Sequence, residues 1–217
     1  MGQLRKGELE DIKQIADILD VRHNVVAWHQ IALGALRYQI DAEAKRNRFQ
    51  EVYRQMMLCA AENTDASIIV QGTLAPDKIK SGATGGAKIK SHHNVGLDFT
   101  PLEQFHPVDH LFKDELRALA RELGLPEGIC NRKPFPGPGL FVRIIGEVTR
   151  EKLETLRWAD AQVRRWVEMY SLSDRFKQLV VAYADLPTVC VKGDGRVYKG
   201  SILIRAIDTR DYMTAQG

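Results

Sequence analysis

The stretch "ASIIVQGTL", residues 66–74, decides the fold class. Its apolar, β-branched residues predict a short buried strand, and this run ends abruptly at Gly72, where a polar segment follows. A buried strand that opens into a polar loop is typical of α/β proteins, in which ligands lie at the carboxyl ends of parallel strands. We therefore expect an α/β fold with a parallel sheet and a ligand at the end of this strand.

Helices are predicted on both sides of the strand. Residues 6–20, "KGELEDIKQIADILD", have the apolar spacing of an amphipathic helix, and residues 21–28, "VRHNVVAW", predict a short strand. Residues 42–62 predict a long helix with a buried face, and residues 109–129 predict a further helix that Gly124 and Pro126 end. The buried face of the long helix is expected to hold Phe49, Val52, Met56, Cys59 and Ala60.

A rigid turn divides the chain near residue 134. Three prolines and two glycines lie within residues 134–139, "PFPGPG", so we expect two domains, residues 1–134 and 135–217. The second is predicted to be a small α+β unit, with one helix packed on a mostly antiparallel sheet. Its predicted elements are a strand at 140–148, a helix at 149–172, strands at 178–186 and 188–192, a tight turn at 193–196 and a strand at 201–208.

Composition favours an ordinary globular protein. Of the 217 residues, 44% are hydrophobic and 27% are charged, and the formal net charge is +3. That charge suits an anionic ligand such as a nucleotide but not a DNA-binding stripe, so no nucleic-acid partner is expected. Cys59, Cys130 and Cys190 form no C-x-x-C pair and are expected to be free thiols in a reducing cytoplasm. No apolar run approaches the roughly 20 residues of a membrane helix, and the N-terminus shows no signal-peptide pattern, so we expect a cytoplasmic protein without a membrane partner.

The long loop at residues 73–95 contains most of the polar chemistry. In "KIKSHHNVG", residues 88–96, His92 and His93 are adjacent and point to opposite sides of an extended backbone, which disfavours metal chelation. The neighbouring donors suit phosphate oxygens or a developing negative charge, and a solvated lid without a partner is the alternative. These donors are Lys88, Lys90, His93 and Asn94.

Two turns are weaker candidates for ligand contacts. "PFPGPGL", residues 134–140, has no polar side chain, so it is either a rigid backbone surface for a ligand or a structural linker. In "GDGR", residues 193–196, Asp194 can cap the turn, and Arg196 offers a planar fork to phosphate or to a purine edge. A plain hairpin turn is the alternative for this tetrapeptide.

The order of the motifs is more specific than any one of them. The series "LRKGE", "VQGTLAPDKIKSG", "KIKSHHNVG", "LFKDELR", "RKPFPGPGL" and "VKGDGR" closely resembles the ATP-pyrophosphatase and dimerisation domains of GMP synthetases, over residues 2–214. The resemblance implies a parallel-sheet ATP-pyrophosphatase domain of the adenine nucleotide alpha-hydrolase-like type, truncated at its N-terminus, followed by a small α+β dimerisation domain. It also implies ATP and Mg²⁺ as cofactors, XMP or a GMP-like purine nucleotide as substrate, a homodimer, and a glutamine amidotransferase domain or subunit as ammonia donor.

The resemblance also assigns roles to individual residues. It implies that the catalytic residues are Lys90, His92, His93 and Asp77, with Asp77 also at the magnesium ion. It implies ATP contacts from Gly72, Thr73 and Ser91. It implies nucleotide-substrate contacts from Arg132, Pro136, Gly137, Gly139, Gly193, Asp194, Gly195 and Arg196.

The sequence departs from the family pattern at several points. The serine–glycine–glycine–x–aspartate–serine phosphate loop is expected before "LRKGE", and a lysine–proline–proline stretch is expected after the last residue. Lys80 stands where the family has glutamate, and Lys133 where it has histidine. We therefore expect this chain alone to form GMP inefficiently or not at all. The alternatives are a catalytically retired paralogue acting as a dimeric nucleotide-binding or scaffold protein, and a different adenylating enzyme with another purine-like substrate.

Overall fold

A computed structural model of the chain describes residues 3–80, 97–133 and 135–208. Contacts divide the chain into two compact units, which we call unit 1 (Met1–Lys45 and Lys133–Gly217) and unit 2 (Arg46–Arg132). The predicted domain boundary lies next to the junction at Lys133, whereas the N-terminal residues group with the C-terminal part of the chain. The functional division into domains 1–134 and 135–217 stays a prediction.

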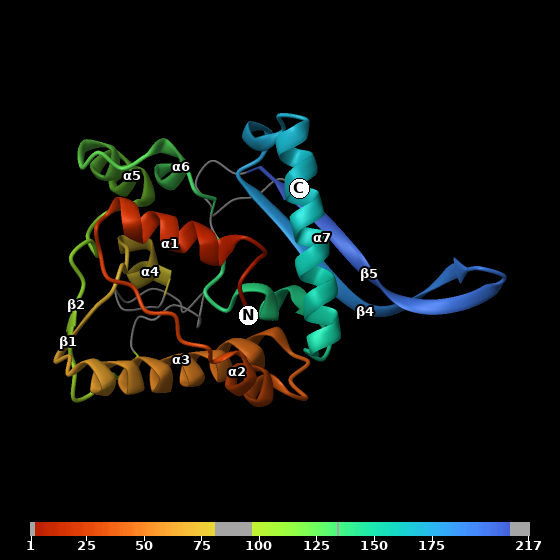
Figure 1. The fold of residues 1–217 in the computed structure, drawn as a ribbon, viewed down its shortest axis with the longest axis horizontal. Coiled ribbons are helices and arrows are strands. Elements are labelled where there is room, and N and C mark those ends of the chain that lie inside the picture. Colours follow the sequence, from red (N-terminus) through yellow and green to blue (C-terminus); the bar gives the residue numbers. More distant parts are fainter. Residues whose placement is uncertain (1–2, 81–96, 134, 209–217) are drawn as a thin grey trace. The chain divides into compact units, whose positions relative to one another are not determined.

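Unit 2 contains the predicted parallel sheet. Strand β1 (Ile68–Val70) pairs in parallel with β2 (Glu103–Phe105), and Ile69 lies opposite Gln104. The strand predicted in "ASIIVQGTL", residues 66–74, is therefore confirmed as β1. Helix α4 (Ala75–Lys80) follows β1, and α5 (Lys113–Glu122) and α6 (Glu127–Cys130) follow β2, as Figure 1 shows.

The long helix α3 (Ala42–Thr64) supplies much of the interior of unit 2. Phe49 and Val52 are buried as predicted, whereas Met56, Cys59 and Ala60 are only partly buried. Tyr53 meets the ring of Phe99 edge-on, with 6.4 Å between the ring centroids, and burial raises the pKa of the Tyr53 hydroxyl. The buried hydrophobic residues of unit 2 are Phe49, Val52, Ala61, Ile69, Leu74, Phe99 and Cys130.

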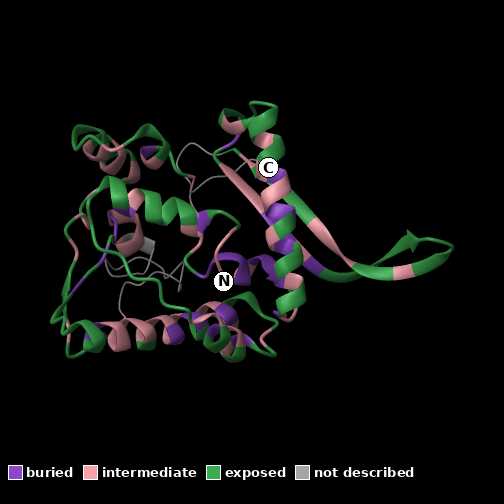
Figure 2. Cartoon of the chain, viewed as in Figure 1, coloured by how far each residue is buried: buried purple, intermediate pink, exposed green. Residues whose placement is uncertain are grey.

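Unit 1 has one long helix against a small sheet, as predicted. Helix α7 (Arg150–Met169) begins at Thr149, whose hydroxyl accepts a hydrogen bond from the Lys152 backbone at 3.3 Å. The sheet has the order β3-β4-β5, in which β3 (Ile144–Ile145) runs parallel to β4 (Gln178–Lys192), and β4 runs antiparallel to β5 (Gly195–Ile207). Figure 2 shows buried residues along α7 and at the near end of the sheet. They include Leu153, Leu156 and Val163 on α7 and Val181 and Ala184 on β4.

The far halves of β4 and β5 form a two-stranded arm, which we define as residues 185–200. The two predicted strands at 178–186 and 188–192 are one strand, β4, with an irregularity between Ala184 and Thr188. In Figure 1 the arm extends beyond α7, and its side chains are largely exposed. Its exposed apolar side chains are Leu186, Val189, Val191 and Tyr198.

One predicted strand is wrong and another is mostly wrong. Residues 21–28 form no strand between α1 (Glu8–Ile18) and α2 (His29–Leu36), and Val21, Val25 and Val26 are more than half exposed. A strand needs a neighbour to bond its backbone, and no described strand pairs with this segment. The second holds only in part: residues 140–143 belong to the 3₁₀ helix η1 (Gly139–Arg143), because the preceding Pro138 has helical backbone angles, φ −67° and ψ −4°, and only Ile144–Ile145 form a strand.

The overall class is therefore α/β, with a two-stranded parallel sheet in unit 2 and a three-stranded mixed sheet in unit 1. Among the described residues, no helix combines the length and the apolar character that a membrane span requires.

Candidate functional site

The carboxyl edge of β1 holds Gly72 and Thr73, two of the three residues for which the resemblance implied ATP contacts. Beyond β1, the Gln71 backbone N–H donates to the Phe105 oxygen at 2.9 Å and prolongs the pairing of the two strands. Gly72 is exposed, and the position of its absent Cβ has no atom within 4 Å, so the backbone is approachable there. Thr73 is 7% exposed, and α4 begins two residues later.

Asp77 lies in the first turn of α4. Its Oδ2 accepts a hydrogen bond from the Leu74 backbone at 3.1 Å, which holds the segment between strand and helix in place. No group of three His, Cys, Asp or Glu side chains within the described residues is arranged to hold a metal ion. Mg²⁺ commonly uses one or two carboxylates, with phosphate oxygens and water as the remaining ligands. Asp77, which is partly buried, fits that mode of binding.

Two pairs of polar side chains connect the segment just after β1 with β2 and with the residue that follows β2. Gln71 Nε2 donates to Gln104 Oε1 at 3.0 Å, and Thr73 Oγ1 lies 2.9 Å from His106 Nδ1. Residues two apart on an extended chain share a face, so these four side chains form one row, which we call the polar ladder. Gln71 is 7% exposed, and its Oε1 has no hydrogen-bond donor among the described residues. A buried acceptor without a donor costs about 1–3 kcal/mol, so a donor from a ligand or from water is favoured here.

Charged side chains lie next to the ladder. Lys78 Nζ is 2.6 Å from Asp109 Oδ2, and His110 Nδ1 is 3.8 Å from Asp109 Oδ1. The hydrogen bond from Lys78 lowers the pKa of Asp109, and the charges of Lys78, His106 and His110 lower it further. Three groups that can be cationic thus surround one carboxylate, an arrangement that suits an anionic ligand.

In unit 1 the "LRKGE" segment packs on the proline-rich turn and on α7. The Leu140 N–H donates to the Gln3 oxygen at 2.9 Å, and Arg157 Nε donates to the Leu4 oxygen at 3.0 Å. Gly139 has φ +63°, and a Cβ there would collide with the backbone and side chain of Gln3. The room that Gly139 leaves is therefore occupied by the chain itself. By contrast, Gly137 is exposed, with open space around its Cβ position.

An aromatic ring with two arginines lies beside this turn. The Arg5 guanidinium is 4.3 Å from the centre of the Phe135 ring, and that of Arg143 is 5.8 Å from it. Burial lowers the pKa of Arg143, and the Asp160 carboxylate opposes that shift. The aromatic ring and the two guanidinium groups bring an apolar surface and positive charge together, which suits a purine nucleotide.

Lys133, which departs from the family pattern, ties the turn to the region before β4. Its Nζ donates to the Ser173 oxygen at 2.5 Å and to the Phe176 oxygen at 3.0 Å, and it lies 4.1 Å from the centre of the Phe176 ring. Burial lowers the pKa of this ammonium. Lys133 thus has a structural use in unit 1.

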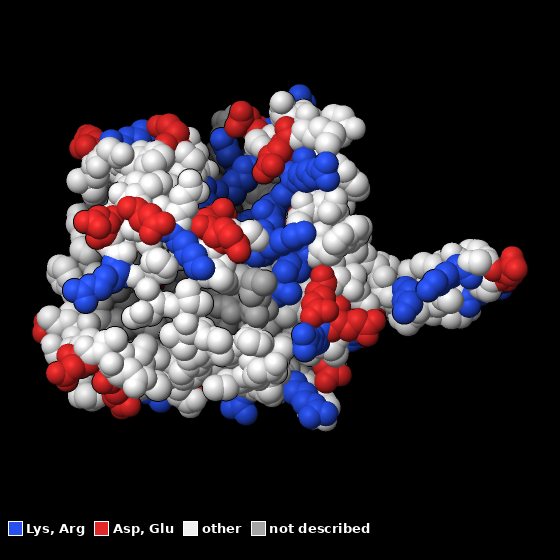
Figure 3. Space-filling model, viewed as in Figure 1, with Lys and Arg blue, Asp and Glu red and all other residues white. Residues whose placement is uncertain are grey.

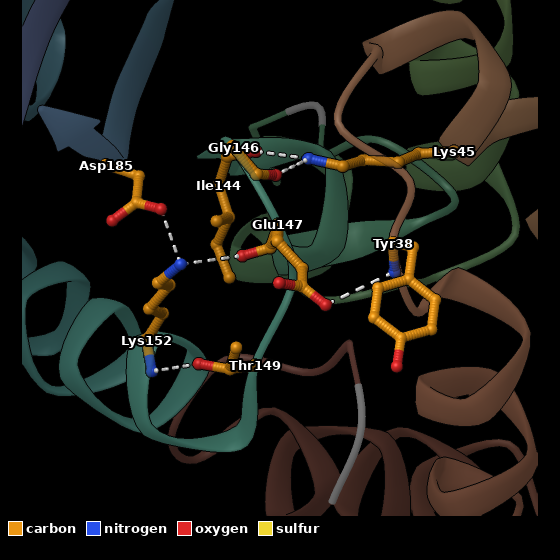
Figure 4. A network of polar contacts seen from close by, with 8 residues as sticks. All are labelled: Tyr38, Lys45, Ile144, Gly146, Glu147, Thr149, Lys152 and Asp185. Carbon is orange, nitrogen blue, oxygen red and sulfur yellow. Dashed lines mark hydrogen bonds and ion pairs between the residues drawn. The ribbon is translucent and has the colours of Figure 1, made fainter.

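A second buried lysine, absent from the sequence-based predictions, holds the start of the sheet. Lys45 is 1% exposed, and its Nζ donates to the oxygens of Ile144 and Gly146 at 2.6 and 2.5 Å, as Figure 4 shows. Close by, Lys152 Nζ is 2.6 Å from Asp185 Oδ2. Burial lowers the pKa of Lys45. We call these contacts the Lys45 network.

The "GDGR" segment forms the tip of the arm. Gly193 has φ +61°, and Lys192 pairs with Gly195 across a two-residue turn. Gly193, Asp194, Gly195 and Arg196 are all exposed. Figure 3 shows Lys and Arg side chains along the arm and an acidic group at its tip. The binding role assigned to these four residues stays a prediction.

The remaining predicted residues lie elsewhere. Lys90, Ser91, His92 and His93 are outside the described residues, and so is the side chain of Lys80. Arg132 is described and exposed, directly after α6 in unit 2, and Pro136 is partly buried in unit 1. The structure thus brings Gly72, Thr73 and Asp77 together at one sheet edge, and their roles stay predictions.

Sequence reasoning missed the polar ladder. The available signal was a pair of polar residues two apart in each segment, Gln104 and His106 in "EQFH" (residues 103–106) and Gln71 and Thr73 in "IVQGT" (residues 69–73). Interpreting that signal requires knowing that the two segments pair.

Comparison with known proteins shows that the chain is similar to part of the GMP synthases. Residues 166–217 match the family model described as GMP synthase C terminal domain. The chain is 44% identical over 225 residues to the GMP synthase [glutamine-hydrolyzing] of Streptomyces coelicolor, and 44% identical over 227 residues to that of Corynebacterium jeikeium. Each alignment covers 99% of this chain but 43% of the relative, so the chain spans less than half the length of these curated relatives. The resemblance predicted from the motifs is confirmed.

Proposed function

We propose that this chain carries the synthetase part of a GMP synthetase-type ligase of purine nucleotide biosynthesis. In the proposed reaction, ATP adenylates O2 of XMP with release of pyrophosphate, and ammonia then displaces AMP at C2 to give GMP. The similarity to GMP synthases over 99% of the chain supports this assignment. The overall chemistry requires activation, because a carbonyl oxygen is a poor leaving group until it is adenylated.

The observation that carries the proposal is the placement of Gly72, Thr73 and Asp77. They follow β1 directly, at the carboxyl edge of a parallel pair of strands, where α/β proteins bind nucleotides. In this proposal the exposed backbone at Gly72 and the Thr73 hydroxyl contact the phosphates of ATP, and Asp77 contributes one carboxylate to Mg²⁺. Lys90, His92 and His93 would add positive charge over the phosphates, and Ser91 would add a further contact to ATP.

The XMP site is proposed to use backbone and cationic groups. Its proposed residues are Arg132, Pro136, Gly137, Gly139, Gly193, Asp194, Gly195 and Arg196. The ring of Phe135 with its two arginines supports a purine nucleotide as the ligand of unit 1.

A homodimer is part of the proposal. A two-stranded ribbon alone in water is marginally stable, and the arm exposes apolar side chains on both strands, with Leu186 64% and Tyr198 63% exposed. A second copy would cover this surface. Ammonia would come from a glutamine amidotransferase domain or subunit, and the proposed compartment is the cytoplasm.

The test is direct detection of the products. The purified chain is incubated with XMP, MgATP and ammonium, and GMP and AMP are quantified by mass spectrometry beside the full-length Streptomyces coelicolor relative. Equal amounts of GMP and AMP, formed more slowly than by the relative and more slowly still by Thr73→Val, are the expected result. XMP binding without products would favour the alternative, a retired paralogue acting as a nucleotide-binding scaffold. Neither binding nor products would contradict both.

A further inference from the structure

His106 lies at the end of the polar ladder, and no role has been assigned to it so far. It directly follows β2 and is half-buried. Its Nδ1 is 2.9 Å from Thr73 Oγ1, so the ring and the hydroxyl share one hydrogen bond. Because Thr73 is itself 7% exposed, this contact largely determines the orientation of its hydroxyl group.

The hydrogen bond has two arrangements with opposite consequences. A threonine hydroxyl has one hydrogen to give and accepts through its lone pairs. If Nδ1 carries no hydrogen, it takes the hydroxyl hydrogen, and Thr73 can only accept from anything else. If Nδ1 carries a hydrogen, it donates to Oγ1, and the hydroxyl hydrogen is available to a third group.

An anionic oxygen selects between these arrangements. A phosphate oxygen without a hydrogen can only accept, so Thr73 binds it only by donating. The hydroxyl must then accept from Nδ1–H of His106. We propose that His106 is a positioning residue that turns the Thr73 hydroxyl hydrogen toward a phosphate-bearing ligand, an inference that rests on the proposed function in taking that ligand to be ATP.

The surroundings of His106 agree with a charged ligand. Asp109 interacts electrostatically with His106, and the same carboxylate binds Lys78 at 2.6 Å and His110 at 3.8 Å. One carboxylate thus faces three groups that can be cationic. The backbone of Gly72, the residue before Thr73, is exposed.

The first measurement is of the ring itself. Long-range ¹H–¹⁵N NMR spectra of the full chain distinguish Nδ1 with and without a hydrogen. With saturating MgATP, His106 should carry a hydrogen on Nδ1, and Thr73→Val should change the Nδ1 chemical shift. An Nδ1 without hydrogen in the nucleotide-bound chain would overturn the inference.

The second measurement is MgATP affinity by calorimetry. Loss of one hydrogen bond to a charged group weakens binding by about tenfold or more, so Thr73→Val and His106→Leu should each show that loss. The double variant should bind MgATP no more weakly than either single variant, because each substitution removes the same chain of hydrogen bonds from His106 through Thr73 to the ligand. His106→Asn, whose amide can place a donor near the position of Nδ1, should bind within about threefold of the unaltered chain. His23→Leu, at an exposed position outside the ladder, is the matched control.

The outcomes separate the inference from the proposed function. If His106→Leu binds like the unaltered chain while Thr73→Val is weakened, Thr73 acts without His106 and the inference is wrong. If the unaltered chain binds no MgATP, the proposed function is contradicted. In that case an Nδ1 signal of His106 that Thr73→Val leaves unchanged would also contradict the hydrogen bond between His106 and Thr73. An Nδ1 signal that Thr73→Val changes would support that hydrogen bond.

Discussion

In unit 1 the buried Lys45 ammonium donates to two backbone oxygens, whereas in unit 2 the buried Gln71 keeps an oxygen for which no described residue supplies a donor. Both side chains are less than one-tenth exposed. The Lys45 network joins α3, β3 and the following turn through contacts within the chain. In the polar ladder, Gln71 Oε1 has no donor within the described part of the chain. A buried polar group whose hydrogen bonds are made within the chain stabilises the fold, whereas a buried polar group that lacks a partner is suited to bind a ligand or water.

The largest expected effect comes from removing Lys45. Lys45→Met keeps an unbranched side chain but leaves the oxygens of Ile144 and Gly146 without this donor, so unfolding free energy should fall by about 2–4 kcal/mol. Urea unfolding followed by circular dichroism measures the change. Lys13→Met, at an exposed position, is the control and should stay within about 0.5 kcal/mol. An unchanged Lys45→Met would show that the network does not stabilise unit 1.

Gly146→Ala should break the same network less severely. Gly146 has φ +108°, and a Cβ there would lie 2.6 Å from Asp185 Cβ. Backbone strain of this kind costs about 1–3 kcal/mol, and we expect a loss near the middle of that range. Gly137→Ala, with open space around it and no positive φ, should change stability little in the same unfolding experiment. Equal losses at both glycines would contradict the assignment of strain to Gly146.

Gln71→Met should have a much smaller effect on stability. The substitution removes the hydrogen bond to Gln104, and it also removes an acceptor for which the described residues offer no donor. These changes oppose each other, so we expect unfolding free energy to stay within about 1 kcal/mol of the unaltered chain. A loss as large as that of Lys45→Met would mean that the ladder serves stability, and the contrast between the units would fail.

The smallest effect concerns pH. Burial lowers the pKa of Lys45 in the folded chain below its ordinary value of 10.5. At pH values between the lowered pKa of the folded chain and 10.5, Lys45 binds more protons in the unfolded chain than in the folded chain. The contribution of Lys45 to the unfolding free energy therefore rises with pH. The unfolding free energy of the unaltered chain minus that of Lys45→Met should therefore increase as pH approaches 10.5 from below. The subtraction cancels other groups, such as Tyr53, whose raised pKa acts in the opposite direction. A difference that is constant with pH would contradict the direction of the shift.

Elements with a strong local pattern were predictable from sequence. Helix α7 repeats its apolar residues at helical spacing, β1 is a run of β-branched residues, and "GDGR" has the glycines of a hairpin turn. Residues 21–28 were misassigned because their pattern is local, whereas forming a strand requires a partner. The helical turns of η1 were missed because Pro138 and Gly139 override the apolar run that follows.

The candidate site was only partly predictable. Gly72, Thr73 and Asp77 follow a recognisable strand, but β2 is three exposed residues without an apolar pattern. The closeness of His106 to Thr73 depends on the register of β1 with β2, which joins segments more than thirty residues apart. Lys45 was not predicted because a lysine at a helix start is usually solvated, and its acceptors lie about a hundred residues later in the chain.

The arm has a consequence for how the chain opens. Strand β4 is continuous from Gln178 to Lys192, yet its first half is covered by α7 and its second half is exposed. Amide hydrogens in the arm should therefore exchange with solvent through local openings of low free energy, while those near Val181 should exchange only when unit 1 unfolds. A single strand would thus show a gradient of protection along its length, with its steepest step at the irregularity between Ala184 and Thr188.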